Sequence, residues 1–349
     1  MSAAATALAA FPRPLGFSAL LDGAARLRPD RPALSDQQNT LTFAKFDARV
    51  SALAAQLSAL EVGLPARALL LGGASASAVV LAFAALRAGF DLALAPAHLE
   101  PEDLARHTAE LAPSILLVDP FFLSAQGEEE VLALAGAQQS VRVICSLQLI
   151  DGAVLLDMDR AEASGSSACN GSIFLRSVDG TLHACAQADL LQAGLDVATQ
   201  GKIRANEPIL STLSPMSFAG LVAGPIAALL AGAQCALHAP FESTRLSAEF
   251  DMLAPCHVVA PARIASLLVE ARVIAPEACA SLVIVHDGPA TPGLAHMQIA
   301  GLDFTARAGV DYSLEPRVLT RHPLALLGER MRARGPTAPL AVKESHARD

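Results

Sequence analysis

Residues 176–184, RSVDGTLHA, have the placement of a phosphate-binding loop, between an apolar strand-like segment and a helix-like one. Such a loop binds an anion through several converging backbone amides and a lysine. This turn offers one glycine, Gly180, next to Asp179, and no lysine follows closely. His183, of a residue type that is mostly neutral near pH 7, is nearest to the lysine position. An ordinary strand-to-helix turn is the alternative interpretation.

Two histidines have a nearby side chain with which they could form a catalytic pair. His286 and Asp287 follow an apolar run, so they are expected at the carboxyl end of a strand, where open α/β sheets bind ligands. A polar start to a loop is the alternative. His183 and Cys185 are two residues apart on a predicted turn or helix start, which puts them on different faces of a helix and disfavours a Cys-His nucleophile. A G-x-S-x-G elbow does not occur, so a hydrolase has little support.

The composition is that of a globular protein. The 349 residues are enough for about two domains, and 53% of them are apolar. The formal net charge of -9, without a run of lysine or arginine, argues against a nucleic-acid partner. Six cysteines are scattered without a CxxC pair, which suggests neither a zinc site nor a disulfide framework and fits reduced thiols in the cytoplasm.

Two uncharged stretches, residues 68–86 and 208–241, are long enough to cross about 30 Å of hydrocarbon. The first is interrupted by GGASAS and the second by three prolines, so both fit buried strand, turn and helix segments better. The N-terminus has no basic region before its apolar part, which argues against a signal peptide. We therefore expect a cytoplasmic protein without a membrane span.

Short apolar runs alternate with helix-like segments along most of the chain. Residues 42–60 place apolar side chains at spacings of three and four behind Thr42, which predicts an amphipathic helix with a capping residue. Apolar strands and helices then alternate through residues 68–119 and again through 208–288. This alternation predicts two doubly wound α/β lobes, each a largely parallel sheet covered by helices.

The predicted domain organisation follows from that alternation. The first lobe is expected at residues 15–200 and the second at 201–329, with a boundary near QGKIRANEP. Residues 1–14 are expected to be flexible. Residues 330–349 mix charge with proline and glycine, which is typical of a disordered tail.

In the order and spacing of these elements, about residues 15–325 resemble the adenylate-forming superfamily of acyl-CoA synthetases, peptide-synthetase adenylation domains and luciferases. Residues 41–119 are the best match. The resemblance implies ATP-dependent activation of a carboxylate to an acyl-adenylate, followed by transfer to a thiol or amine. Family members continue through a small β-barrel, a hinge and a mobile C-terminal domain with a lysine, and the resemblance implies that this sequence lacks them.

The family's phosphate loop, T-S-G-T-T-G-x-P-K-G, aligns one residue short with residues 176–184. The resemblance implies cofactor-binding roles for Ser177 and Gly180, which keep the pattern, and a catalytic role for His183 in the lysine position. Val178 replaces a glycine, and Asp179 puts negative charge where phosphates would lie. A triphosphate is therefore not expected to bind as it does in the family.

Three further family motifs are partly kept. Residues 215–220 retain Phe218 and Gly220 but lack the histidine of the aromatic-histidine motif, and by default they are core and turn residues. Gly288 matches the glycine-rich turn after the strand that precedes the acyl pocket, and the resemblance implies a cofactor-binding role for it. The Y-G-x-T-E motif is reduced to DYSLEP, where the resemblance implies that Tyr312 contacts the cofactor and that Glu315 binds Mg²⁺ and is catalytic. A surface turn ending at Pro316 is the alternative.

These departures favour a degenerate AMP-binding, acyl-CoA synthetase-like protein, a pseudoenzyme without complete adenylation activity. It is expected to act as a subunit that binds an acyl group, an acyl carrier, or another ligase or biosynthetic subunit, and no cofactor is assigned to it. The alternative is an AMP-forming acid-thiol ligase, a fatty acyl ligase completed by another chain, that uses ATP and Mg²⁺.

Overall fold

The computed structural model describes most of the chain between residues 16 and 286. The described residues are 16–60, 62–63, 66–160, 171–176, 182–261, 264–265, 267–268, 271–275, 278–286 and 310–313. The predicted flexible N-terminus and the predicted disordered tail both lie outside them.

The first sheet has seven strands in the order β7-β6-β5-β3-β4-β8-β9. Its strands are parallel except β9, which runs antiparallel to β8. They are β3 (Arg67–Gly72), β4 (Asp91–Pro96), β5 (Ile115–Val118), β6 (Val143–Ser146), β7 (Val154–Leu155), β8 (Ile173–Arg176) and β9 (Leu182–Cys185). The central strands β3 and β5 are buried along almost their whole length, as expected for a parallel sheet with helices on both faces.

The second sheet also has seven strands, in the order β14-β13-β12-β10-β11-β1-β2. All neighbours pair in parallel except β1 and β2. The strands are β1 (Pro32–Ser35), β2 (Thr40–Thr42), β10 (Ile209–Ser211), β11 (Cys235–Leu237), β12 (Cys256–Pro261), β13 (Cys279–His286) and β14 (Val310–Ser313). An N-terminal hairpin thus extends a sheet built otherwise from residues beyond 208.

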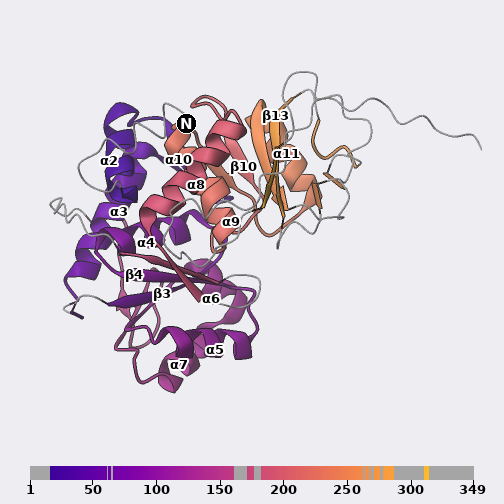
Figure 1. Ribbon diagram of the computed structural model, residues 1–349. Coiled ribbons are helices and arrows are strands. Elements are labelled where there is room, and N and C mark those ends of the chain that lie inside the picture. Colours follow the sequence, from indigo (N-terminus) through magenta and orange to yellow (C-terminus); the bar gives the residue numbers. More distant parts are fainter. Residues whose placement is uncertain are drawn as a thin grey trace, which may run out of the picture.

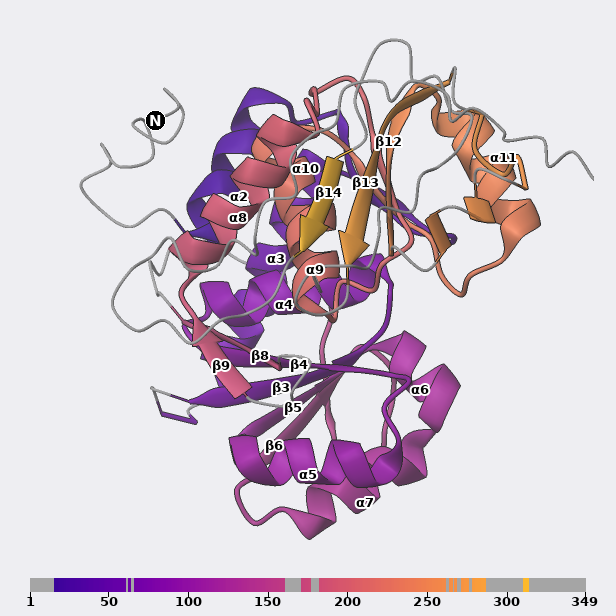
Figure 2. The same cartoon turned by 45° about the vertical axis from the view of Figure 1, so that its right-hand side comes forward.

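Helices lie between the two sheets and outside them (Figure 1). The inner layer contains α2 (Phe17–Leu27), α3 (Phe43–Ser58), α4 (Ala76–Arg87), α8 (Gln187–Gln200), α9 (Phe218–Leu221), η1 (Val222–Ile226) and α10 (Ala227–Ala231). The helices α5 (Pro101–Leu111), α6 (Pro120–Gln126) and α7 (Glu128–Ala137) cover the outer face of the first sheet, and α11 (Ser243–Leu253) covers the outer face of the second (Figure 2). One apolar core includes side chains of the inner helices and of both sheets, so the two sheets share their largest packing layer.

The inner helices begin where the sequence provides a cap and a buried face. In α3, the Thr42 hydroxyl accepts a hydrogen bond from the Lys45 backbone N–H at 3.3 Å. The apolar positions Phe46, Val50 and Leu53 are buried against the core, as their spacing predicts. The helix α4 is buried all round because α3 covers it on one side and the first sheet on the other. Pro225 lies within the π-helical turn η1, where it has no N–H to donate.

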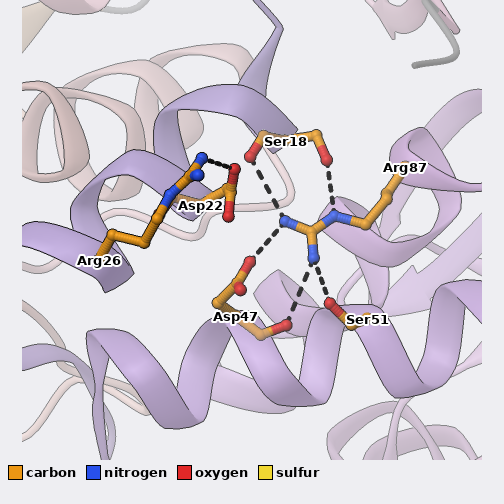
Figure 3. A network of polar contacts seen from close by, with 6 residues as sticks. All are labelled: Ser18, Asp22, Arg26, Asp47, Ser51 and Arg87. Atoms are coloured by element: carbon orange, nitrogen blue, oxygen red, sulfur yellow. Dashed lines mark hydrogen bonds and ion pairs between the residues drawn. The ribbon is translucent and has the colours of Figure 1, made fainter. Parts of the chain in front are cut away.

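Arg87 joins three inner helices through a buried guanidinium at the end of α4 (Figure 3). Its Nε donates to the Ser18 hydroxyl at 2.6 Å, and Nη1 donates to the Ser51 hydroxyl at 2.6 Å. Its Nη2 lies 2.7 Å from an Asp47 carboxylate oxygen. Further bonds go to the backbone carbonyls of Ser18 and Asp47, so all three nitrogens of the guanidinium are hydrogen-bonded. Burial of this cation is compensated by pairing, and the network fixes α2 and α3 against α4.

The predicted fold class is confirmed, because both sheets are largely parallel and covered by helices. The predicted domain boundary at residue 200 stays a prediction. The sheets do not follow it strictly, since β1 and β2, at residues 32–42, belong to the second sheet. The pairing of β1 with β11, about two hundred residues away, leaves no local pattern in the sequence.

Among the described helices, none is both long and apolar enough to cross a bilayer. The two candidate stretches, residues 68–86 and 208–241, contain strands and short helices of the two lobes. The cytoplasmic location stays a prediction.

Candidate functional site

The parallel strands of the second sheet, among them the five from β10 to β14, end on one side of the sheet, which we call the candidate edge. The strands β10, β11, β12, β13 and β14 all run in the same direction. Ligands of open α/β sheets gather outside the carboxyl ends of such strands. The residues at these ends are Ser211, Leu237, Pro261, His286 and Ser313.

The strands β13 and β14 bring two of the predicted site segments to neighbouring positions. In their register Tyr312 pairs with Val285, and Ser313 pairs with His286. Tyr312 therefore lies in a strand, and the alternative of a surface turn is wrong for this residue. Gly288 follows the end of β13 by two positions, and Glu315 follows the end of β14 by two positions. Both residues lie outside the described residues, and so does Asp287. The strand β14 leaves no clear pattern in the sequence, because four residues are too few to show a period.

The predicted phosphate-loop segment is a connection between two antiparallel strands. The strands β8 and β9 pair in a register that matches Ile173 with Cys185 and Arg176 with Leu182. The prediction of a strand followed directly by a helix start was therefore wrong, since β9 intervenes and α8 begins only at Gln187. Ser177 and Gly180, in the connection, lie outside the described residues.

The position of His183 also differs from the prediction. It lies on β9, two residues before Cys185, and not on a turn or at the start of a helix. Burial raises the pKa of the Cys185 thiol to about 11, with a smaller contribution from Asp189. Because the thiolate is the nucleophile, this cysteine is poorly suited to nucleophilic catalysis at neutral pH.

The turn that replaces the family's aromatic-histidine motif is compact and local. The Ser217 hydroxyl accepts a hydrogen bond from the Gly220 N–H at 3.1 Å and donates one to the Ser214 carbonyl at 2.8 Å. Phe218 is 5% exposed and packs in the main core. The interpretation of Phe218 as a core residue is confirmed, whereas Gly220 lies in the short helix α9 and not in a turn. The turn also reaches the first sheet, because the Met216 sulfur lies 3.1 Å from the point where a Cβ on Gly72 would be.

Gly220 is required by close packing, which gives a direct test. A Cβ at this position would lie 2.0 Å from the Ser214 carbonyl oxygen. We expect Gly220→Ala to lower the free energy of unfolding by about 1–3 kcal/mol, because the backbone must move to admit the methyl group. Urea unfolding followed by circular dichroism measures the change.

Gly224→Ala is the matched control for Gly220→Ala. Gly224 is also buried, but its added Cβ would meet the Ser211 hydroxyl at 3.4 Å and the Cys235 sulfur at 3.5 Å, which are ordinary contacts. A Gly220 variant as stable as the Gly224 variant would contradict the packing argument.

A buried polar cluster that the sequence analysis missed lies at the carboxyl edge of the first sheet. Asp119 follows β5, is 0% exposed, and caps α6 by accepting a hydrogen bond from the Phe121 N–H at 3.1 Å. It also accepts hydrogen bonds from the hydroxyls of Ser75 at 2.9 Å and Ser77 at 2.5 Å. Ser75 in turn caps α4 by accepting a hydrogen bond from the Ala78 N–H at 3.1 Å. One cluster thus ties together two helix N-termini.

Burial raises the pKa of Asp119 above its ordinary value of 3.8, and the hydrogen bonds from Ser77 and Ser75 oppose that rise. An available sequence signal was the pattern of Asp119 followed by Pro120, an N-cap and a proline at the first helical position. Asp119 is fully buried and accepts hydrogen bonds at both of its carboxylate oxygens, so we assign the cluster to the support of the sheet edge and not to contact with a ligand.

The β1–β2 turn connects the first sheet's edge with the loop after β11. An Asp36 carboxylate oxygen accepts a hydrogen bond from the Ala76 N–H, at the start of α4, at 2.8 Å. The next residue, Gln37, donates its side-chain amide to the Ala239 carbonyl. These two contacts connect a helix that packs on the first sheet with a loop of the second, on the side where the parallel strands end.

A buried histidine, His238, stabilises the loop after β11 through two hydrogen bonds. His238 Nδ1 lies 2.7 Å from a Glu249 carboxylate oxygen, and His238 Nε2 accepts a hydrogen bond from the Glu242 N–H at 3.2 Å. Nε2 is thus the acceptor, so the ring proton lies on Nδ1 and points to Glu249. The ring of Phe241, 52% exposed, stands edge-on to His238 with centroids 5.8 Å apart. The loop therefore presents an apolar ring at the candidate edge.

Within the described residues, no three His, Cys, Asp or Glu side chains gather in a group that could bind a metal ion. Glu315, the predicted Mg²⁺ ligand, is outside this part of the chain.

Residues 21–172 match the sequence profile of the family described as AMP-binding enzyme. The resemblance to the adenylate-forming superfamily is confirmed. The matched AMP-binding region includes strands and helices of the first lobe together with the β1–β2 hairpin of the second sheet. No match was found among curated proteins.

Solved structures of ligases share the fold of this chain. A benzoate CoA ligase from Burkholderia xenovorans is 20% identical with a TM-score of 0.69, over 86% of this chain and 61% of that one. MbtA from Mycobacterium smegmatis is 18% identical with a TM-score of 0.66, over 81% of this chain and 54% of that one. An o-succinylbenzoate CoA synthetase from Bacillus subtilis is 18% identical with a TM-score of 0.63, over 78% and 54%. The chain thus spans little more than half the length of these three proteins.

Proposed function

We propose that this protein is a degenerate relative of the acyl-CoA synthetases, without complete adenylation activity, that binds an acyl group or a partner. The observation that carries the proposal is the sequence of the β8–β9 connection, residues 177–181, which reads SVDGT. A phosphate loop needs converging amides and a cation, and this connection has one glycine and one carboxylate.

The charge of Asp179 opposes a triphosphate. At about 4 Å from a phosphate oxygen, two like charges repel by about 1 kcal/mol in water and about 4 kcal/mol near a protein surface. No lysine follows within the connection or β9. The net charge of -9 adds no general attraction for an anion.

An acyl or partner ligand fits the rest of the candidate edge better than a nucleotide does. The exposed ring of Phe241 offers apolar surface near the strand ends. Ligand sites of proteins are mostly apolar with a few placed polar groups. The occupants we propose are an acyl chain, an acyl carrier, or another ligase or biosynthetic subunit.

The alternative is an AMP-forming acid-thiol ligase completed by another chain. The register of β13 and β14 favours this alternative, because it puts Tyr312 next to the carboxyl end of β13. Ligands of open α/β sheets bind at the carboxyl ends of parallel strands. Ser177, Gly180, Tyr312 and Glu315 would then be the surviving site, with ATP and Mg²⁺ as cofactors.

Titration calorimetry separates the two functions. We expect no heat of binding from MgATP or AMP at concentrations up to about 1 mM, with or without medium-chain fatty acids, because the phosphate site lacks its cation. Fatty acid alone, or an acyl carrier protein, is expected to bind. Micromolar nucleotide binding that strengthens when acid is present would refute the degenerate protein and support the ligase.

A charge variant sharpens the same experiment. If a phosphate site survives, Asp179→Asn should tighten MgATP binding by about fivefold or more, because a repulsion of about 1–4 kcal/mol is removed. Asp251→Asn, on the outer helix α11, is the matched control for the loss of one negative charge. We expect neither variant to bind MgATP measurably.

A further inference from the structure

Two cysteines lie opposite each other at the amino ends of neighbouring strands. Cys256 is the first residue of β12 and Cys279 the first of β13, and the register of this parallel pair matches them directly. Both side chains belong to the apolar cluster on the outer face of the second sheet, beneath α11. The two thiols therefore share one face of the sheet.

The backbone spacing suits a covalent link. Neighbouring strands are about 4.8 Å apart, and a disulfide needs Cα atoms about 4.4–6.8 Å apart. The register shifts between Cys256 and His257, where Ala280 is an extra residue on β13. Such an irregularity interrupts the regular ladder and allows local adjustment of the two Cβ directions.

The thiols also influence each other. Burial raises the pKa of Cys256 to about 12, and Cys279 contributes further to the rise. Cys279 Sγ lies 3.3 Å from the Ser281 carbonyl oxygen, to which it donates. Cys279 is 9% exposed whereas Cys256 is fully buried, so Cys279 is the sulfur that a small oxidant reaches first.

The other described cysteines have no cysteine opposite them on a neighbouring strand. In the strand registers Cys145 pairs with Leu117 and Val154, Cys185 with Ile173, and Cys235 with Leu34 and Ile209. None of these three faces another cysteine across its strand pairs. The scattered spacing in the sequence hid the one opposed pair, because residues 256 and 279 meet only through the sheet.

We propose that Cys256 and Cys279 form an oxidation site in which a hydroperoxide converts the two thiols to a cross-strand disulfide. The Cys279 sulfur attacks hydrogen peroxide, the O–O bond breaks, and Cys279 becomes a sulfenic acid as one water leaves. The Cys256 sulfur then attacks the sulfenic sulfur, forming the S–S bond and releasing a second water. The two thiols lose two electrons and two protons, and the peroxide is reduced to water.

The bond would close a loop of the chain from residue 256 to residue 279. It would fix the amino ends of two strands whose carboxyl ends belong to the candidate edge. A loop of this length restricts the unfolded chain, so we expect oxidation to raise the melting temperature by about 5 °C. Because both thiols are buried and protonated at neutral pH, the reaction is expected to be slow and to need sustained oxidation.

Peptide mapping of the full chain tests the proposal without any variant. The reduced protein is treated with hydrogen peroxide, free thiols are alkylated, and the protein is digested with trypsin without reduction. Cleavage after arginine places Cys256 in the peptide 246–263 and Cys279 in the peptide 273–307, each with no other cysteine. We expect these two peptides joined, at a mass about 2 Da below their sum, and separated again by dithiothreitol.

Variants provide the controls. Cys256→Ala is expected to abolish both the link and the rise in melting temperature on oxidation. Cys145→Ala, at an equally buried cysteine of the first sheet, is expected to keep both. A sulfinic acid on Cys279 without the link, a link to another cysteine, or a link only between two chains would overturn the proposal.

Discussion

Replacing Arg87 with alanine is expected to lower the free energy of unfolding by about 2–4 kcal/mol, somewhat less than the loss of one partner of a fully buried ion pair, because the Asp47 side chain left behind is 23% exposed. The truncation leaves the Asp47 carboxylate and the hydroxyls of Ser18 and Ser51 without their buried donor. Unpaired polar groups in a protein interior lose their hydration without recovering it. Urea unfolding monitored by circular dichroism measures the loss.

Arg26 provides the matched control, since it also pairs with an aspartate on the same helix layer (Figure 3). Its side chain is 73% exposed, and exposed pairs contribute about 0–1 kcal/mol. Arg26→Ala is therefore expected to be nearly neutral. Arg87→Lys, which keeps the charge but loses the planar fork, should fall between the two. Equal stability of the Arg87→Ala and Arg26→Ala proteins would contradict the structural role of the network.

The second large effect is expected at Asp119. Asp119→Ala removes the N-cap of α6 and the acceptor of two serine hydroxyls, so we expect a loss of about 2–4 kcal/mol in unfolding free energy. Ser124→Ala, which removes a hydroxyl from an exposed position of the same helix, is the control and is expected to change little. A near-neutral Asp119→Ala would contradict the cluster's role in fixing the two helix starts.

Asp119→Asn gives the pH dependence of the same site. The folded-state pKa of Asp119 is raised above 3.8, so the folded protein keeps this proton to a higher pH than the unfolded chain does. The contribution of this protonation to stability is fully present below the pKa of Asp119 in the unfolded chain. It is lost as the pH rises through the pKa of Asp119 in the folded protein. We expect the stability of the wild type relative to Asp119→Asn to increase as the pH falls from 7 towards 4. If the difference in stability between the two proteins stays unchanged or decreases as the pH falls, burial is not the dominant influence on the pKa of Asp119.

The local patterns of the chain predicted much of the first lobe. The apolar runs and helix-like segments at residues 68–119 correspond closely to β3, α4, β4, α5 and β5. The face spacing of residues 42–60 correctly predicted α3 and its cap at Thr42. Hydrophobic period and capping chemistry act over a few residues, so they are visible in a single sequence.

The candidate site was less predictable. The sequence placed the phosphate-loop segment after the correct strand, but β9 was read as the start of a helix, because four residues such as LHAC carry no distinctive period. The Asp119 cluster and the pairing of His238 with Glu249 arise from residues that meet in space, over separations of 11 to 44 positions. Pattern analysis does not connect such residues.

The sequence by itself determined the α/β alternation, the buried strands, the helix caps and the altered chemistry of residues 177–181. Each depends on neighbouring residue types and on their spacing. Only the tertiary structure decided that β1 and β2 join the second sheet, that Tyr312 lies beside the end of β13, and that Cys256 faces Cys279. The order of strands in each sheet depends on how both sheets pack around one shared layer of helices. That packing consists of contacts between parts of the chain that are distant in sequence.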